Sequence, residues 1–293
     1  MAADSAAAAL PATIGVVGVG TIASAVVRGL CSPGGPSPPP KFVLSPRGAA
    51  KAAALAQEFP ASVRVAGSNQ EVVDAVDCVI VAVLPKQAED VLTSLTFREG
   101  QQVLSLIAIV KLARLKEIVA PATECAIGVP LPAVAQRRGA TLLIPSRPFA
   151  RNIFNILGSC VVAEDEAHFK RMQCITALMG DLYKRQLTAQ EWLESHGVPR
   201  PDAAAWVGAS FATMAADSSR PGPDTFERLV AEQTPGGLNE MTWRGQEEDG
   251  NYKAIKYSLD AVHHRLITGT VDPELVPAAK RARVGDPSPK GAA

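Results

Sequence analysis

The residues whose types and spacing could do chemistry first gather near the start of the chain, in a glycine turn. The apolar run Ile14 to Val17 precedes Gly18 and Gly20, and a helical pattern begins at Thr21. Such a run is typical of a strand that is buried on both faces. Gly18 permits a tight turn, and Gly20, which has no side chain, lets a phosphate group approach the backbone.

The helix after this turn would complete a binding site for a diphosphate. Ala23 is small enough to let the helix pack close to the preceding strand. The backbone N–H groups of Thr21, Ile22 and Ala23 lie at the helix N-terminus, where they can hold a pyrophosphate. A glycine turn that follows a strand and opens a helix predicts a dinucleotide site, and the alternative is a plain strand-to-helix turn.

The end of the next predicted strand, near Leu44, discriminates between the two nicotinamide dinucleotides. A site for NAD usually places Asp or Glu there to accept a hydrogen bond from the ribose 2′-hydroxyl. This chain has no carboxylate between Leu44 and Gly48 and offers the hydroxyl of Ser45 and the guanidinium of Arg47. Both groups suit the 2′-phosphate of NADP, because a guanidinium binds phosphate oxygens with two charged hydrogen bonds. The alternative is that they only cap the helix that starts near Gly48.

A second stretch with possible ligand contacts follows the strand predicted at Cys78–Leu84. Ligands of a parallel sheet bind beside the carboxyl ends of its strands. Val83, Leu84, Pro85 and Gln87 would therefore lie next to the cofactor. A proline that merely ends the strand explains the same residues equally well.

Strand-like and helix-like segments alternate through the first half of the chain, which predicts a doubly wound, mostly parallel α/β sheet of the Rossmann type. The predicted strands are Thr13–Val17, Lys41–Ser45, Val63–Ala66, Cys78–Leu84, Gln102–Ile107, Glu124–Val129 and Thr141–Pro145. The predicted helices between them are Thr21–Leu30, Gly48–Glu58, Asn69–Ala75, Lys86–Leu95 and Lys111–Ile118.

Strand patterns are absent after about Val162, where an all-helical domain is predicted. Its helices are expected at Glu164–Leu178, Thr188–His196, Asp202–Ala216, Phe226–Glu232 and Asn251–Leu266. A helical domain with more apolar surface than one bundle needs often serves oligomerisation, so a homodimer or higher homo-oligomer is expected. The expected boundaries are a disordered extension at 1–11, a dinucleotide-binding domain at 12–162, a helical dimerisation and substrate domain at 163–269, and a disordered tail at 270–293.

Composition narrows the possible partners and the compartment. The formal net charge is zero, which argues against nucleic acid or an anionic membrane as the main partner. No apolar run approaches the ~20 residues that span a bilayer. The residues before the first strand include no basic ones and fit neither a secretory signal nor a transit peptide. The cysteines are scattered and show no disulfide framework, so a reduced, cytoplasmic protein is expected.

No metal site is expected from the cysteines and histidines. The cysteines are scattered and include no CxxC pair, which speaks against a zinc site or a disulfide framework. The histidines lack the spacing of metal ligands and are interpreted as surface or capping residues. These residues are Cys31, Cys78, Cys125, Cys160, Cys174, His168, His196, His263 and His264.

Taken together, these motifs resemble the pyrroline-5-carboxylate reductase family over the range from about Thr13 to Gly269. The family's Ser-x-Arg segment for NADP matches Ser45 and Arg47. The resemblance adds two cofactor contacts, Asn69 and Ala108. It implies an NADPH-dependent oxidoreductase that reduces a small cyclic imine, and the family's own reaction is the reduction of pyrroline-5-carboxylate in proline biosynthesis.

The most specific match to the family is the loop at 234–240, which would open a helix in the helical domain. The resemblance implies that amides of this loop face the substrate carboxylate, with Gly236, Gly237 and Leu238 as contacts. In the family, the last threonine of the loop hydrogen-bonds the ring nitrogen of the imine, and Asn239 stands there in this chain. Hydride then passes to the imine carbon without a protein nucleophile, so positioning supplies most of the acceleration.

Departures from the family are concentrated in the substrate half. Asn239 still both donates and accepts hydrogen bonds, so it could serve an imine or a carbonyl. Glu240 could supply or relay a proton, or act only as a first-turn carboxylate that the helix dipole favours. Trp243 could line the pocket, and Ile109 replaces a glycine of the family. Two functions stay open: reduction of pyrroline-5-carboxylate or a related imine or oxo substrate, and an NADP-binding sensor or interaction protein without catalysis.

Overall fold

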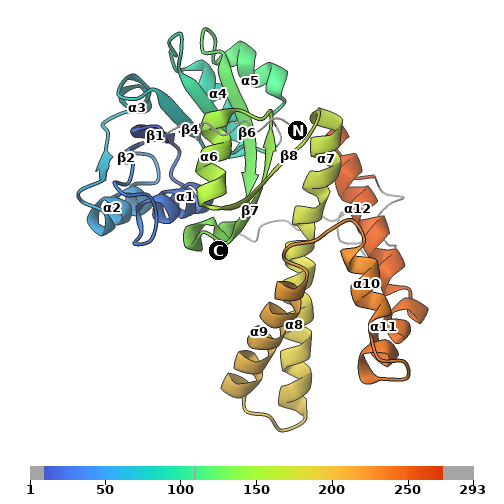
Figure 1. The fold of residues 1–293 in the computed structure, drawn as a ribbon. Coiled ribbons are helices and arrows are strands. Elements are labelled where there is room, and N and C mark those ends of the chain that lie inside the picture. Colours follow the sequence, from blue (N-terminus) through green and yellow to red (C-terminus); the bar gives the residue numbers. More distant parts are fainter. Residues whose placement is uncertain (1–9, 109, 273–293) are drawn as a thin grey trace, which may run out of the picture. The chain divides into compact units, whose positions relative to one another are not determined.

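The structure, a computed structural model, describes residues 10–108 and 110–272 of the chain (Figure 1). It divides into two compact units, of which the first ends at Gln173 and the second begins at Cys174. Most of the predicted extension at 1–11 and of the predicted tail at 270–293 lies outside the described residues, and so does Ile109.

The first unit is built on a sheet that has eight strands among the described residues, in the order β3-β2-β1-β4-β5-β6-β7-β8. Neighbouring strands pair in parallel except β6 and β7, which are antiparallel. Because β1 pairs with β2 on one side and β4 on the other, its carboxyl end is a switch point where ligands bind. The strands are β1 Thr13–Val17, β2 Lys41–Leu44, β3 Val63–Val65, β4 Cys78–Val81, β5 Gln102–Ser105, β6 Glu124–Pro130, β7 Gly139–Ile144 and β8 Gly158–Val162.

Helices cover both faces of this sheet and bury two apolar cores. Leu30, Leu55 and Phe154 belong to the core on one face, together with α1, α2 and α6. Leu92 and Phe169 belong to the core on the other face, with α3, α4, α5 and α7. The helices are α1 Thr21–Cys31, α2 Ala49–Glu58, α3 Asn69–Asp74, α4 Ala88–Thr93, α5 Leu112–Ile118, α6 Pro148–Ile156 and α7 Glu166–Gln173, with 3₁₀ turns at Pro85–Gln87 and Pro132–Gln136.

The predicted doubly wound sheet is confirmed, with differences at its second half. The strand predicted to run to Leu84 ends at Val81, and Leu84 is 67% exposed. The segment at 146–162, for which no element is predicted, forms α6 and β8. β8 lies at the edge of the sheet and none of its residues is buried, so the apolar run of a central strand is missing from its sequence.

The second unit is built from helices joined by loops, without a strand among the residues that the structure describes in it, as predicted. Its α8 is one continuous helix, whereas the sequence pattern predicts separate helices that end at Leu178 and begin at Thr188. Gly180 is tolerated inside it despite a cost of about 1 kcal/mol. The helices are α8 Leu178–Ser195, α9 Arg200–Asp217, α10 Thr225–Ala231, α11 Leu238–Glu248 and α12 Asn251–Thr268, after a 3₁₀ turn at Cys174–Ala177.

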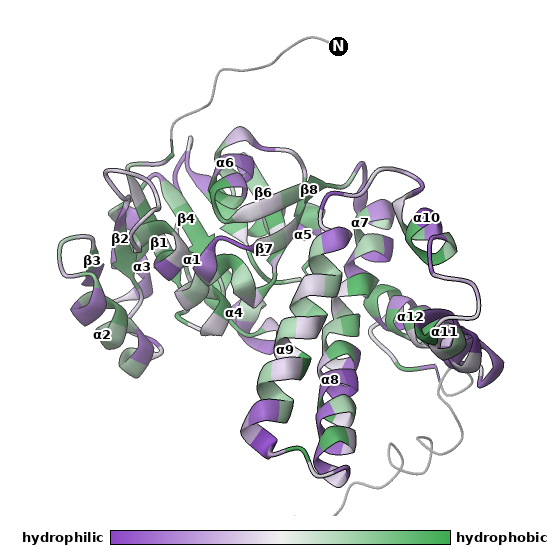
Figure 2. Ribbon diagram, turned by 60° about the horizontal axis from the view of Figure 1, so that its bottom comes forward, coloured by the Kyte–Doolittle hydropathy of each residue, from purple (hydrophilic) through white to green (hydrophobic). Residues whose placement is uncertain are grey.

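Apolar residues are distributed differently in the two units. Figure 2 shows them along the strands of the sheet, and in separate patches on α8 and α9. In α8, α11 and α12, whose residues are all described, none is buried. Within the described residues, no helix has both the length and the apolar character needed to cross a bilayer.

Candidate functional site

The glycine turn after β1 has the backbone geometry of a ligand cradle. Gly18 has φ +90°, and a Cβ there would lie 2.9 Å from the carbonyl of Ala82. Gly20 is the N-cap of α1, and the nearest atom to a Cβ there would be 4.0 Å away. The turn is therefore packed closely on the loop after β4 at Gly18 and has free space at Gly20, beside the first amides of α1.

Those first amides belong to Thr21, Ile22 and Ala23, as predicted. No side chain caps them, and the first turn of α1 contains no acidic residue. Ala23 is 1% exposed in the core, which brings α1 close to the sheet. The first N–H groups of a helix have no partner within the helix, so they suit a phosphate.

Two cations lie at the end of β2, on one side of the glycine turn. Ser45 is fully buried, and its Oγ accepts a hydrogen bond from the backbone N–H of Arg47 at 3.2 Å. The Arg47 side chain is exposed and has no acidic partner among the described residues. Lys51, in the first turn of α2, donates to Thr21 Oγ1 at 3.0 Å. Arg47 and Lys51 thus place positive charge where a 2′-phosphate is expected, and the first turn of α2 adds no carboxylate.

Lys51 is a candidate that the sequence reasoning missed. The signal was its place one turn after Gly48, because Gly48 (φ +88°) is the N-cap that starts α2. Only the observed bond to Thr21 shows that α2 leans toward the glycine turn.

Asn69, the first residue of α3, carries a polar atom that the rest of the structure leaves unsatisfied. Its Oδ1 is buried and has no hydrogen-bond partner among the described residues. Ser68, not Asn69, caps the helix by accepting from the N–H of Glu71 at 3.1 Å. A buried acceptor without a partner costs free energy, so a hydroxyl or amino donor from a bound nucleotide would fit there.

The remaining expected cofactor contacts lie at the ends of β4 and β5. Val83 is half-buried against Gly18, and Pro85 opens a 3₁₀ turn that ends at Gln87. Ala108, beyond β5, is half-buried, and its carbonyl accepts a hydrogen bond from Lys170 Nζ at 3.1 Å. Lys170 comes from α7, far along the chain, and no sequence pattern connects the two residues.

In the second unit, the loop before α11 is held by its own hydrogen bonds. Gly236 (φ +71°) donates its N–H to Glu240 Oε2 at 2.6 Å, and Gly237 donates to the Thr234 carbonyl at 2.8 Å. The loop opens a helix as predicted, because α11 begins at Leu238. The expectation that the amides of Gly236 and Gly237 face a ligand is not met here, since both are used inside the loop. Leu238 is 78% exposed.

The carboxylate of Glu240 is tied to this loop and to Arg244. The guanidinium of Arg244 donates to Glu240 Oε1 at 2.7 Å. The Gly236 N–H and then the Arg244 side chain lower the pKa of Glu240 below its usual value. A carboxyl with a lowered pKa is charged at neutral pH and is a weak proton donor.

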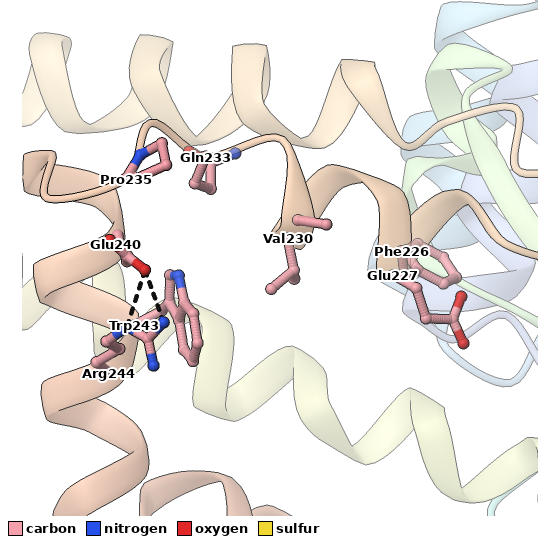
Figure 3. Close-up of a pocket in the computed structure, with 9 residues that line it drawn as sticks. Phe226, Glu227, Val230, Gln233, Pro235, Glu240, Trp243 and Arg244 are labelled. Atoms are coloured by element: carbon pink, nitrogen blue, oxygen red, sulfur yellow. Dashed lines mark hydrogen bonds and ion pairs between the residues drawn. The ribbon is translucent and has the colours of Figure 1, made fainter.

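Asn239 and Trp243 lie four residues apart on α11 but contact different groups. Asn239 Nδ2 donates to Gln233 Oε1 at 2.8 Å. Trp243 lines a cavity of about 680 Å³ (Figure 3). Its Nε1 is buried and has no hydrogen-bond partner in the part of the chain that the structure describes. The Arg244 guanidinium lies 4.6 Å from the centre of the Trp243 ring. The other lining residues are Phe226, Glu227, Val230, Ala231, Gln233, Pro235 and Glu240.

Thiol chemistry finds no support in the described cysteines. None of them forms a disulfide with another described residue, and burial raises the pKa of each of them, to about 12 for Cys78 and about 11 for Cys31. Because only a thiolate is a good nucleophile, these cysteines stay unreactive near neutral pH. Within the described residues, no three His, Cys, Asp or Glu side chains cluster closely enough to hold a metal ion.

A comparison with known families matches part of the first unit. Residues 13–109 match the model of the family described as NADP oxidoreductase, coenzyme F420-dependent. This range holds every expected cofactor contact from Gly18 to Ala108, so the cofactor that the match indicates is NADP. No curated protein sequence matches the chain.

Solved structures match over most of the chain. The pyrroline-5-carboxylate reductase from Streptococcus pyogenes is 22% identical, with TM-score 0.71, covering 87% of this chain and 97% of that one. The enzyme of the same name from Coxiella burnetii is 17% identical, with TM-score 0.73, covering 92% and 100%. A reductive aminase from Aspergillus terreus, in complex with NADPH4, cyclohexanone and allyl amine, is 17% identical, with TM-score 0.56, covering 89% and 96%.

At these identities, the likeness to solved structures shows the fold. The family match adds a coenzyme class for the residues from β1 to the end of β5. Residues 13–109 therefore carry the dinucleotide-binding domain of NADP-type oxidoreductases, and the chain as a whole is pyrroline-5-carboxylate reductase-like in its fold.

Proposed function

We propose that the protein is an NADPH-dependent reductase of a small cyclic imine, either pyrroline-5-carboxylate, which it reduces to proline, or a related imine or oxo substrate. The observation that carries the proposal is the set of groups in the first unit that suit NADP. Gly18 and Gly20 shape the turn, and Arg47 and Lys51 supply two cations beside it. The orphan Oδ1 of Asn69 adds an acceptor at the same edge.

In this proposal, the start of α11 binds the substrate. The first N–H groups of a helix lack intrahelical partners and lie at the positive end of its dipole, so they suit a carboxylate. The amides of Gly236 and Gly237 are used within the loop, which leaves those of Leu238 and Asn239 for a ligand. Trp243 would supply an apolar wall and a buried N–H donor.

The bound cofactor would supply the hydride, and the protein would supply positions. Asn239 would hydrogen-bond the imine nitrogen, because its side chain is both donor and acceptor. Its present bond to Gln233 would be exchanged for that contact. Glu240 would hold the loop as a carboxylate rather than give up a proton. Correct placement of hydride donor and acceptor accounts for the rate enhancement without a nucleophile.

A second candidate function is that of an NADP-binding protein without catalysis. The observation that favours it is the state of α11: Leu238 is exposed, Asn239 is bonded to Gln233, and Glu240 is paired with Arg244. Such a protein would sense NADP or act through its helical unit. It keeps the same cofactor contacts, so only turnover separates the two candidates.

The experiment that tests the proposal is a turnover assay with the full chain, NADPH and pyrroline-5-carboxylate, followed by loss of absorbance of NADPH. A panel of other cyclic imines and small oxo acids is then assayed in the same way. Turnover with any member supports the reductase and identifies its substrate class. Tight NADPH binding without turnover on the whole panel would reject the reductase in favour of the non-catalytic candidate.

A further inference from the structure

The backbone on the two sides of the segment between β5 and α5, at Ala108 and at Leu112, is held by two side chains from α7. Glu166 Oε1 accepts a hydrogen bond from the N–H of Leu112 at 2.9 Å, and Lys170 Nζ donates to the carbonyl of Ala108 at 3.1 Å. Residues four apart lie on the same face of a helix, so both side chains reach the loop from one side. They contact the loop at its two ends, just after β5 and at the start of α5.

The helix that carries these side chains is anchored in the core of the first unit. Phe169, between them, is 2% exposed and belongs to the same apolar core as Ile107 and Leu115. Ile107 precedes Ala108, and Leu115 lies in the first turns of α5. The helix and the two flanks of the loop are therefore packed together, so a shift of either hydrogen bond would disturb a filled core.

The Lys170 ammonium is half-buried, so its charged form needs hydrogen-bond and charge partners such as Ala108 and Glu166. Burial lowers its pKa, Glu166 raises it, and Lys111 lowers it. A cation withdrawn from water is costly unless its hydrogen bonds are made. The hydrogen bond to the Ala108 carbonyl is one of those that satisfy the ammonium. Because its donor is charged, this bond is stronger than one between neutral groups.

The strand order places this loop at the nicotinamide end of a bound dinucleotide. The residues proposed to bind the adenosine half of NADPH, Ser45 and Arg47, follow β2, which lies on one side of β1. The glycine turn follows β1 and suits the diphosphate. The second half of the dinucleotide must then extend over β4 and β5, on the other side, where neighbouring strands are ~4.8 Å apart. Ala108 is the third residue after β5.

We infer that Glu166 and Lys170 are positioning residues that fix the backbone at Ala108 and Leu112, after β5, for the nicotinamide ring. The inference rests on the proposed binding of NADPH and deepens it. Neither side chain needs to touch the cofactor, because each acts through the backbone of the loop at Leu112 and Ala108. If either hydrogen bond is lost, the backbone at Ala108 and Leu112 can adopt other conformations. Binding of the nicotinamide ring is then weaker, because part of the binding free energy is used to order this backbone.

The test compares two ligands that differ in the ring end. NADPH contains the nicotinamide half, whereas 2′,5′-ADP contains only the phosphorylated adenosine half. Both are titrated into the full chain and into Lys170→Met by calorimetry. We expect Lys170→Met to weaken NADPH about tenfold, the loss of roughly one charged hydrogen bond, and to leave 2′,5′-ADP within about twofold.

The matched control is Arg171→Met, which removes an exposed cation from the next position of the same helix. It should leave both ligands unchanged. Lys170→Arg keeps a charged donor and should restore most of the affinity for NADPH. Amide hydrogen exchange without any ligand gives an independent readout, since Lys170→Met should speed the exchange of the N–H groups of Val110 and Leu112.

The outcomes distinguish the positioning role of Glu166 and Lys170 from the proposed function. If Lys170→Met weakens both ligands equally, or leaves the affinity for NADPH unchanged, the positioning role is rejected, whereas NADPH binding by the unaltered chain still stands. Failure of the unaltered chain to bind either ligand overturns the proposed function itself. If Lys170→Met does not fold, Glu166→Leu, which removes the acceptor of the Leu112 N–H, is titrated in the same way, and the same two criteria apply.

Discussion

At the residue scale, the choice of cofactor depends on Arg47. Its guanidinium follows β2 without a carboxylate partner among the described residues, and Lys51 adds a second cation nearby. We expect Arg47→Ala to weaken NADPH by about 10- to 100-fold, because charged hydrogen bonds contribute about 1.5–3 kcal/mol. NADH, which lacks the 2′-phosphate, should change little. Titration by protein fluorescence measures both dissociation constants.

The control for this prediction is Arg138→Ala, which removes an exposed arginine of the same unit away from the glycine turn. It should change neither dissociation constant. Equal loss of NADPH and NADH in Arg47→Ala would reject a phosphate contact. Lys51→Met should show the same selectivity with a smaller loss, since its ammonium is shared with Thr21.

Asn239 carries the proposed contact to the reacting nitrogen. Once a substrate is known, we expect Asn239→Ala to lower kcat about 10- to 100-fold with a small change in KM, because the bond would strengthen in the transition state. Asn239→Thr, which restores a donor and acceptor, should recover much of the rate. Steady-state kinetics measure both. An unchanged kcat in Asn239→Ala would remove this residue from the mechanism.

The charge of Glu240 gives a pH dependence with a definite sign. Because its pKa in the folded protein is lowered from 4.5, the carboxylate stabilises the loop above that pH, and this stabilisation is lost as the pH falls through the lowered value. We expect the unaltered chain to melt above Glu240→Gln at pH 7 and the two to converge in acid. Melting curves from pH 7 to pH 3 measure this. A difference that grows in acid would contradict the assignment.

At the scale of elements, the turn between β1 and α1 depends on close packing against the loop after β4. Gly18 and Gly100 both have positive φ, but a Cβ at Gly18 would meet Ala82 at 2.9 Å, whereas Gly100 has nothing within 4 Å. We expect Gly100→Ala to cost about 1–2 kcal/mol of unfolding free energy, because a Cβ disfavours positive φ, and Gly18→Ala to cost more and to abolish NADPH binding. Chemical denaturation and titration test this. Equal effects would show that packing at Gly18 is unimportant.

The elements also show where sequence reasoning succeeds. Strands in the middle of the sheet, such as Cys78–Val81, are continuous apolar runs, and glycine and serine residues mark the starts of α1 and α3. These are local signals, and they locate the turn and the end of β2. The edge strand β8 and the continuous α8 depend on neighbours in the fold, so the local pattern does not indicate them.

The residues of the candidate site also fall into two groups, those that local sequence patterns predict and those that they do not. Gly18, Ser45 and Arg47 are close in sequence to the strands that position them, so their spacing predicts their place. Lys51 and Lys170 act through bonds to other elements, at Thr21 and Ala108. A single sequence carries no signal for such contacts, because they depend on how helices pack on the sheet.

At the scale of the whole molecule, we propose that the exposed apolar surface of the second unit is covered by a second copy of the chain. Trp192, Trp206 and Met214 are 60%, 68% and 64% exposed and line a cavity of about 920 Å³. We expect Trp206→Glu to shift the molecular mass from an oligomer to a monomer. Val65→Glu, at an exposed position of β3, is the control and should leave the mass unchanged. Light scattering measures both. A monomeric unaltered chain would reject the proposal.

The central claim is that the first unit binds NADPH through the turn after β1 and the cations after β2. Calorimetric titration of the full chain with NADPH, and then with NADH, tests it most directly. We expect saturable binding of NADPH and at least about tenfold weaker binding of NADH, because NADH lacks the 2′-phosphate and its charged contacts. No heat of binding with NADPH, together with an unchanged melting temperature at saturating concentrations, would contradict it.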